Sequence, residues 1–383
     1  MNTFNRIAVN ATASYYSFHT ATLAAILTER EFNFIKDQLC KAVGNALTKY
    51  YREPYWHGKT SYNFLVNDKY GFPLVKMIKI SGMNQRTTRK ILITINPRAM
   101  LHKDDYPYVY ISSKEDIRRS LEILTKFFVD VGINDWISLN ILRVDRIDLS
   151  TNINLNDNAT AEQYMKLLRQ GNYPYSSRRV CIYSKSQRRK IPTPNSFTVK
   201  SLRWEFSVYN KQYQLKDNEK KYPKKEIEEA EGIIRFELRL KYPMIYTRAK
   251  RINLSTVNDI LLHADLIAED NFPRYLNKCY GTGAFVKKTE AQKIIESSQY
   301  KAPTKEIMCA MLNCCMQKRN LHIVSEIFSK KTYETLLKRF NTLGISPITI
   351  DSKNPLQRFE APLYYIKNYN ATTSKHNKAV KNT

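Results

Sequence analysis

A period-two alternation of apolar and polar residues recurs between residues 61 and 241, and it restricts this part of the chain to folds rich in β-strands. Successive side chains of a strand point to opposite faces, so such runs predict strands with one apolar and one polar face. The runs at 61–66, 74–81 and 89–96 are separated by NDKYGFP and GMNQRTT, which are rich in turn-forming residues. They therefore predict strands connected by hairpins.

Helical patterns lie between the later strands. Residues 113–131 open with a serine that can cap a helix, and Ile117, Leu121, Leu124 and Phe128 then follow at helical spacing. Helices interleaved with strands predict an α+β domain, with an antiparallel or mixed sheet and helices on one face. The other elements expected here are strands at 143–153, 201–209 and 233–241 and helices at 159–170 and 224–232.

The pattern becomes mostly helical after about residue 250, in stretches such as NDILLHADLIAED and KEIMCAMLNCCMQKR. We therefore predict a sheet domain over residues 1–248 and a mostly helical C-terminal domain over residues 249–367. Residues 368–383 are polar and basic with few apolar side chains, and this composition predicts a disordered tail.

The charge of the chain points to a polyanionic partner. It carries 62 lysines and arginines against 35 aspartates and glutamates, a formal charge of +27. Such an excess attracts nucleic acid. An anionic membrane would be attracted too, but no apolar run approaches the ~20 residues of a spanning helix, and the N-terminus lacks the layout of a signal peptide. The six cysteines form no C-x-x-C pair, which predicts reduced thiols and a cytoplasmic location.

Three of the expected strands carry an arginine and, two residues later, a carboxylate on one polar face. These faces consist of Arg146 and Asp148, of Arg203, Glu205 and Tyr209, and of Arg235, Glu237 and Arg239. If the strands share a sheet, these side chains form one polar patch. The alternative is an exposed sheet face with cross-strand ion pairs, each contributing about 0.2–1 kcal/mol.

The chemistry of this patch suits phosphodiester cleavage. A pair of carboxylates suits a hard divalent cation, Mg²⁺ or Mn²⁺. Beside such a cation, a tyrosine under guanidinium groups is equipped to attack phosphorus and to form a covalent phosphodiester adduct. The metal would polarise the phosphoryl group, and the arginines would neutralise its oxygens.

The sequence resembles the rolling-circle replication initiators, and most closely the gene II replication proteins of filamentous bacteriophages. The resemblance rests on the order and spacing of ITINPRAML (93–101), VDRIDLS (144–150), SVYNKQYQLK (207–216) and GIIRFELRLK (232–241). The VYNK stretch is also similar to the tyrosine-lysine element of plasmid initiators. In this family a tyrosine nicks one strand of the replication origin and keeps the 5′ phosphate, while the freed 3′ hydroxyl primes synthesis.

The resemblance implies a site-specific DNA nickase and religase in a bacterial cytoplasm, with a host helicase and a single-strand-binding protein as partners. It implies that Tyr209 is the nucleophile, that Lys211 contacts a phosphate, and that Asp148 and Glu237 hold the metal. Glu205 lies on the strand face of Tyr209 and is an alternative ligand to Asp148, or else a partner of Arg203.

Tyr213 has a counterpart in only some members of the family, and a metal-binding motif of many members is missing from this chain. Tyr213, one helical turn after Tyr209, corresponds to the second tyrosine of some initiators, or else packs against the sheet. Many relatives hold their metal with a His-hydrophobe-His motif, and no H-x-H occurs in this chain. Carboxylates then do that work, or the metal assignment is wrong.

Two further stretches predict contacts with DNA. Residues 176–190, SSRRVCIYSKSQRRK, predict a basic hairpin that follows phosphates. Residues 320–345 predict either a helix-turn-helix whose second helix enters a major groove or a helical bundle with a charged outer face. The residues expected to contact DNA are Arg146, Arg203, Arg235, Arg239, Arg178, Arg179, Arg188, Arg189, Lys338 and Arg339.

A non-enzymatic origin-binding or transcriptional protein is the alternative function. It would explain the basic charge and the C-terminal helices, but it leaves the three polar strand faces unexplained. A tyrosine recombinase would show His-x-x-Arg before its tyrosine, and no histidine here has an arginine three residues later. The stretch HGKT at 57–60 lacks the earlier glycine of a phosphate-binding loop, because position 53 is glutamate.

Overall fold

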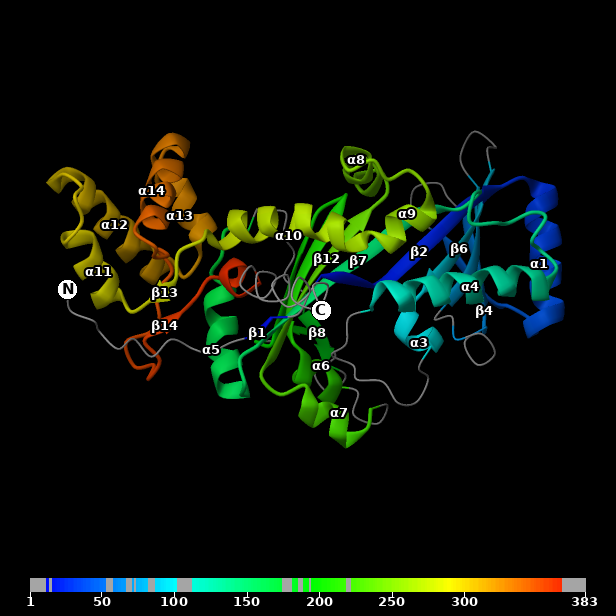
Figure 1. The fold of residues 1–383 in the computed structure, drawn as a ribbon, viewed down its shortest axis with the longest axis horizontal. Helices are drawn as coiled ribbons and strands as arrows, with labels where there is room; N and C mark the ends of the chain where they lie inside the picture. The colour runs from blue at the N-terminus through cyan, green and yellow to red at the C-terminus, as the bar shows by residue number, and fades with distance from the viewer. Residues whose placement is uncertain are drawn as a thin grey trace, which may run out of the picture. The chain divides into compact units, whose positions relative to one another are not determined.

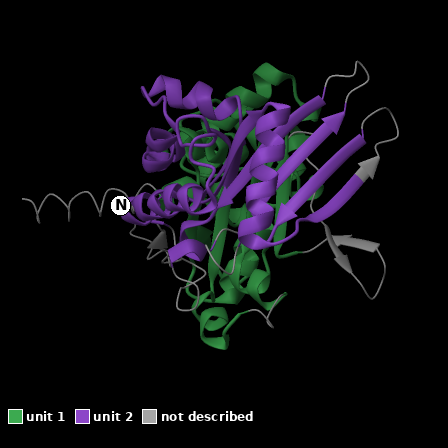
Figure 2. Ribbon diagram, turned by 90° about the vertical axis from the view of Figure 1, so that its right-hand side faces the viewer, with its two compact units in different colours: residues 1–15, 151–237, 269–383 green, residues 16–150, 238–268 purple. Residues whose placement is uncertain are grey.

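In the computed structural model the chain has the α+β architecture that the sequence predicts (Figure 1). The structure describes residues 12–13, 16–52, 58–66, 71, 74–81, 87–101, 112–173, 181–184, 189–192, 194–217 and 222–366. Two compact units are distinguished in Figure 2. Unit 1 comprises residues 1–15, 151–237 and 269–383, and unit 2 comprises residues 16–150 and 238–268.

This division does not follow the boundary that the sequence suggests at residue 248. Strand β7 (Arg143–Asn154), strand β12 (Ile233–Lys241) and helix α10 (Ala264–Tyr280) each contribute residues to both units. The change from strands to helices along the sequence therefore does not coincide with the change from one unit to the other, since each unit contains both strands and helices.

Unit 2 is an antiparallel sheet with helices packed on one face. Its strands are hydrogen-bonded in the order β12-β7-β2-β6-β5-β4-β3. Helix α1 contacts β2, β4 and β6 (Figure 1), and its residues Phe32, Ile35 and Leu39 are buried. The predicted hairpin strands are confirmed. The strands found only in this unit are β2 (Ser17–Leu27), β3 (Leu47–Arg52), β4 (Gly58–Phe64), β5 (Leu74–Ser81) and β6 (Thr87–Ile95).

The helices of unit 2 include the one that the sequence predicts at 113–131. Ser113 caps helix α4: its Oγ accepts a hydrogen bond from Asp116 N at 3.1 Å, and Asp116 Oδ2 accepts one from Ser113 N at 3.0 Å. Gly132 ends the helix in the left-handed conformation. The helices found only in this unit are α1 (Glu29–Val43), α3 (Pro97–Leu101), α4 (Lys114–Val131), α8 (Met244–Arg251) and α9 (Val257–Leu262).

Unit 1 contains strands in the order β10-β11-β12-β7, and β1 also pairs with β7. Strands β8 and β9 pair as an antiparallel hairpin, which was predicted at 176–190 and extends to Pro192, and β13 pairs with β14. The strands found only in this unit are β1 (Thr12–Ala13), β8 (Cys181–Ser184), β9 (Arg189–Pro192), β10 (Ser196–Lys200), β11 (Trp204–Asn210), β13 (Phe285–Val286) and β14 (Arg358–Phe359).

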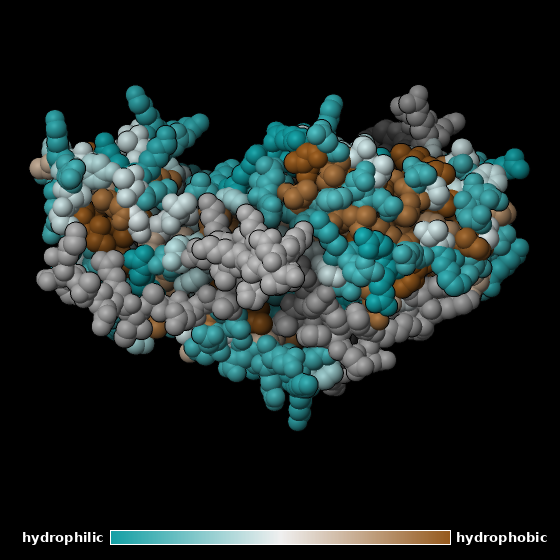
Figure 3. Space-filling model, viewed as in Figure 1, coloured by the Kyte–Doolittle hydropathy of each residue, from teal (hydrophilic) through white to brown (hydrophobic). Residues whose placement is uncertain are grey.

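The helices of unit 1 include most of the predicted C-terminal helical region. Helix α12 buries Met308, Met311 and Cys315, so these three sulfur-containing residues pack in the core, whereas Met316 is exposed. The surface around α7 is hydrophilic (Figure 3). No helix in the described part of the chain combines the length and the apolar character that crossing a membrane requires. The helices found only in this unit are α5 (Asn158–Leu168), α6 (Lys211–Lys216), α7 (Lys224–Glu229), α11 (Lys288–Glu296), α12 (Ala302–Lys318), α13 (Leu321–Ile327) and α14 (Lys330–Thr342).

Candidate active site

Tyr209 lies at the end of β11, directly before helix α6. Phe206 and Val208 of this strand are buried, so Ser207 and Tyr209 point to the opposite face of the sheet. Asn210 then caps α6, because its Oδ1 accepts a hydrogen bond from Tyr213 N at 3.2 Å. The change from strand to helix therefore holds Tyr209 in a fixed position beside the helix start.

The hydroxyl of Tyr209 donates a hydrogen bond to Glu237 Oε1 on β12. Burial and the Glu237 carboxylate raise the pKa of Tyr209 well above its ordinary value, while Arg235 acts in the opposite direction. Arg235 is only 3% exposed, and its Nε donates to Asn152 Oδ1 at 2.8 Å. The phenol is therefore neutral at physiological pH, and it is already bonded to a carboxylate that can take its proton.

Tyr213 is paired with a carboxylate in the same way. Its hydroxyl donates to Glu162 Oε1 at 2.6 Å, and this hydrogen bond raises the pKa of Tyr213. Tyr209 and Tyr213 both line a cavity of about 260 Å³, together with Glu237 and Asp217. The sequence did not indicate Glu162, since it lies 51 residues before Tyr213 with no shared motif.

Asn158 connects the segments that form this cavity. Its Oδ1 accepts hydrogen bonds from Asn210 Nδ2 at 3.2 Å and from Gly232 N at 3.3 Å, and its Nδ2 donates to Gln212 Oε1 at 2.6 Å. Gly232 has a φ of +68°, and a Cβ there would lie 2.6 Å from Asp157 N. The start of α5, the cap of α6 and the start of β12 are therefore held together by one side chain.

Lys211, predicted to contact a phosphate, lies next to the tyrosine but is buried. Its Nζ donates to Gln214 Oε1 at 2.7 Å and lies 5.8 Å from the centre of the Tyr209 ring. Only 5% of the residue is exposed. Lys211 therefore supplies positive charge beside Tyr209 from within the protein.

Asp148, predicted to be a metal ligand, lies in unit 2 between two arginines. Its oxygens accept hydrogen bonds from Arg146, with Nε at 2.8 Å, and from Arg239, with Nε at 2.8 Å and Nη2 at 3.0 Å. Burial would raise the pKa of Asp148, but these hydrogen bonds outweigh it, and the pKa lies below its ordinary value. Both carboxylate oxygens are therefore engaged by guanidinium groups.

This arrangement does not fit the predicted metal site. The two arginines would repel a cation at Asp148, and Glu237 Oε1 accepts the hydrogen bond of the Tyr209 hydroxyl. Glu205 lies 3.7 Å from Lys200 Nζ. Among the described residues no group of three or more His, Cys, Asp and Glu side chains is arranged to hold a metal ion. The need for Mg²⁺ or Mn²⁺ stays a prediction, and no chemical step below depends on it.

The beginning of the predicted strand at 201–209 is corrected by the structure. Ser201 N donates to Trp204 O at 2.8 Å and closes the turn between β10 and β11. Residues 201–203 therefore form the hairpin loop, in which Leu202 is 94% exposed. Arg203 is exposed on this loop and does not share the strand face of Glu205 and Tyr209.

The polar face predicted for the strand at 143–153 is largely buried and is not an exposed patch. Every residue from Ile147 to Ile153 is buried, which includes Asp148 on the predicted polar face. Arg235 is likewise buried on β12. The side chains of Arg146 and Arg239 are about one third exposed, at 34% and 31%, so solvent still reaches these two arginines.

The structure describes only some of the other residues that were predicted to contact DNA. Lys338 is exposed on α14, and Arg339 lies 5.6 Å from the centre of the Tyr300 ring. Helices α13 and α14 are separated by a short turn, and Ser329 in this turn caps α14. Of the basic residues predicted in the 176–190 hairpin, those outside the described residues are Arg178, Arg179 and Arg188, while Arg189 is described only as part of the β9 backbone.

Comparisons with known proteins assign no family to the chain. No protein family matches its sequence, and no curated protein does. Among solved structures it is similar to a rolling circle replication initiator protein from Geobacillus stearothermophilus. The similarity covers 90% of this chain and 100% of that protein, with 8% sequence identity and a TM-score of 0.27. A likeness at this level establishes neither a shared fold nor a shared function.

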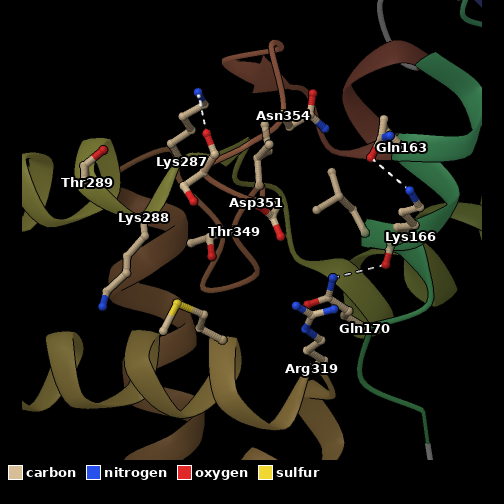
Figure 4. A pocket seen from close by; sticks show the side chains of 14 residues that line it. Gln163, Lys166, Gln170, Lys287, Lys288, Thr289, Arg319, Thr349, Asp351 and Asn354 are labelled. Carbon is tan, nitrogen blue, oxygen red and sulfur yellow. Dashed lines mark hydrogen bonds between the residues drawn. The ribbon is translucent and has the colours of Figure 1, made fainter. Parts of the chain in front are cut away.

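A second cavity, of about 330 Å³, lies beside α5 in unit 1 (Figure 4). Lys166, Lys288 and Arg319 line it, and Lys287 turns toward Ser352 O, to which its Nζ donates at 3.3 Å. Asp351 is the sole carboxylate among the described residues that line this cavity. Since no tyrosine or thiol faces that carboxylate, the cavity suits an anion but offers no paired nucleophile and base.

Proposed function

We propose that the chain is a DNA strand transferase that cleaves and rejoins a phosphodiester bond through Tyr209. The observation that carries this proposal is the hydrogen bond from the Tyr209 hydroxyl to Glu237 at a cavity wall. A nucleophile bonded to its proton acceptor is the arrangement that covalent catalysis requires. DNA is the proposed substrate because the chain has a formal charge of +27 and resembles the rolling-circle initiators.

Glu237 serves as the base in the proposed reaction. It takes the proton of Tyr209 as the phenolic oxygen forms a bond to phosphorus, and the bond between phosphorus and the 3′ oxygen breaks. Glu237 then gives the proton to this 3′ oxygen, so a free 3′ hydroxyl and a 5′ phosphotyrosine result. Attack of a 3′ hydroxyl on the phosphotyrosine reverses these steps and rejoins a strand. Arg235 and Lys211 stabilise the negative charge that develops beside Tyr209.

Within this proposal the biological role is the initiation of rolling-circle replication. The nick would leave a 3′ hydroxyl that a polymerase can extend, and rejoining would close the displaced strand. A helicase and a single-strand-binding protein of the bacterial host would then act on the opened DNA. Tyr213 on the wall of the same cavity supports strand exchange, because it is a second phenol and Glu162 is its proton acceptor.

The test is formation of a protein–DNA adduct. The protein is incubated with single-stranded and supercoiled DNA of the element that carries its gene, with Mg²⁺, with Mn²⁺ and with a chelator. A denaturing gel and peptide mass spectrometry should show an adduct at Tyr209. Tyr209→Phe should abolish the adduct and retain DNA binding. Tyr50→Phe is the matched control, since Tyr50 is a 67% exposed tyrosine of unit 2, and it should behave as the wild type.

Binding without cleavage under any metal condition would refute the proposal. The chain would then be a non-enzymatic DNA-binding protein, for which the exposed Lys338 on α14 is a supporting observation. An adduct that forms equally well in Tyr209→Phe would instead place the nucleophile elsewhere.

A further inference from the structure

Four neighbouring strands of unit 2 are basic and contain no acidic residue. Strands β3, β4, β5 and β6 carry seven lysines and arginines and not one aspartate or glutamate. The chain as a whole has 35 acidic residues, and none of them lies on these four strands. Sheets usually place opposite charges on neighbouring strands, because like charges directly opposite each other destabilise the pairing.

The strand register places four of these lysines on one face. Tyr62 packs against Phe32 of α1, with ring centres 6.0 Å apart, so its neighbours Ser61 and Asn63 point away from α1. Lys49 is paired with Ser61, Ser61 with Ile78, and Ile78 with Lys90. Lys49 and Lys90 therefore lie in one row across the sheet, on the face turned away from α1.

Lys59 and Lys76 lie on the same face, on either side of this row. Lys59 is paired with Ile80, and Lys76 is paired with Asn63. Each is thus two residues along its strand from the row that joins Lys49 to Lys90. The four residues Lys49, Lys59, Lys76 and Lys90 are called the lysine face below.

These lysines are not neutralised by the described part of the protein. None of them forms an ion pair with a carboxylate among the described residues, whereas Arg89, an odd-numbered residue of β6, lies 2.7 Å from Glu29 of α1. Lys49 is exposed, and the other three are partly exposed. Burial, Lys59 and Lys49 together lower the pKa of Lys76. The face thus has a positive charge that an external polyanion would compensate.

We propose that the lysine face binds single-stranded DNA, as a surface separate from the tyrosine cavity. Neighbouring strands lie ~4.8 Å apart, so four adjacent strands span about 14 Å between the backbones of the two outer strands. This sheet face is wider than the ~12 Å major groove of a duplex and cannot enter it. A single strand can instead lie across the face, with its phosphates at the lysines. Its bases then meet Ile80 and Leu92, which the register places on this face beside Lys59 and Lys76.

The test measures binding as a function of salt. The probe is a labelled oligothymidylate, and the variant replaces all four lysines of the lysine face by glutamine. Each phosphate contact contributes about 0.7 to the slope of log affinity against log salt for a single strand, so the slope should fall by up to about 3. Because binding requires no cleavage, a failed cleavage assay leaves this inference standing. An unchanged salt slope in the lysine-face variant, in turn, leaves the proposed function standing, because DNA would then be bound elsewhere on the protein.

The matched control removes four charges from the helices of the same unit. Lys41, Lys114, Arg119 and Lys126 lie on α1 and α4, and their replacement by glutamine keeps the net charge equal to that of the first variant. The control should change the slope by less than about 1. Thermal unfolding should show both variants folded, and relief of repulsion at Lys76 should leave the first at least as stable as the wild type.

An equal loss of slope in the two variants would overturn the inference, because it would show an unspecific effect of charge. An unchanged slope in the first variant would overturn it as well. The same titration with a duplex probe of equal length completes the test. Duplex binding should depend less on the lysine face, and an equal dependence would show a general polyanion surface instead of one for single strands.

Discussion

Glu237→Gln tests the proposed chemistry at its central hydrogen bond. Glutamine has nearly the same shape as glutamate and still offers Oε1 as an acceptor to the Tyr209 hydroxyl, but it cannot take the proton. We therefore expect DNA binding to persist while adduct formation slows. General base catalysis contributes about 10²–10⁴-fold, so at 1.36 kcal/mol per factor of ten the barrier should rise by about 2.7–5.4 kcal/mol.

The pH dependence of this variant gives a second measurement. The pKa of Tyr209 is well above its ordinary value, so almost none of the phenol is ionised near neutral pH. Without a base, the variant depends on the small ionised fraction, and its rate of adduct formation should rise about tenfold per pH unit. The wild type should show a flatter profile over the same range. Single-turnover assays with quenched samples on denaturing gels provide both rates.

The matched control is Glu162→Gln, which alters the carboxylate of the other tyrosine in the same cavity. It should leave the first cleavage at a rate close to that of the wild type. The reasoning is refuted if Glu237→Gln cleaves as fast as the wild type, or if both variants lose activity equally. In either case Glu237 would be a structural partner of Tyr209 and not its base.

Two further variants test the surroundings of the site. Asp148→Asn should lower the free energy of unfolding by about 3–5 kcal/mol, because two arginines lose their buried partner. The folded state lowers the pKa of Asp148 from 3.8. The contribution of Asp148 to the free energy of unfolding is therefore present above about pH 4 and is lost as the pH falls through the pKa of the folded state. Urea unfolding at several pH values should show this loss in the wild type but not in Asp148→Asn. Tyr213→Phe should retain the first adduct and lose the rejoined product on a gel, whereas unchanged rejoining would indicate that Tyr209 acts alone.

Local patterns in the sequence were sufficient for most elements of the fold. The spacing of Ile117 and Leu124 and the cap at Ser113 predicted α4, and the capping hydrogen bonds of the structure agree. Alternation correctly predicted that Glu237 and Arg235 share one face of β12 and that Tyr209 lies near the end of a strand, since β11 ends one residue later at Asn210. The hairpin loop at 201–203 was missed, because apolar Leu202 continues the alternation although it is exposed in the turn.

Long-range features could not be predicted from such patterns. A period of two shows which side chains share a face but not what covers that face, so the burial of Asp148 was not foreseen. Glu162 and Asn158 lie on α5 with no motif that connects them to the tyrosine segment. Their role follows from the packing of α5 near β11, which only the three-dimensional structure reveals. The lysine face was missed for a similar reason, since it depends on the register of four strands.

Strands β7 and β12 and helix α10 each contribute residues to both units, and this restricts where the gene can recombine without disrupting a unit. Recombination at a single point in the gene, such as the codons near residue 248, would separate strands and helices that complete each unit. Neither unit can therefore be exchanged as a contiguous segment between related genes. A natural mosaic should have its crossover points outside the stretch from β7 to α10, or should replace that stretch as a whole.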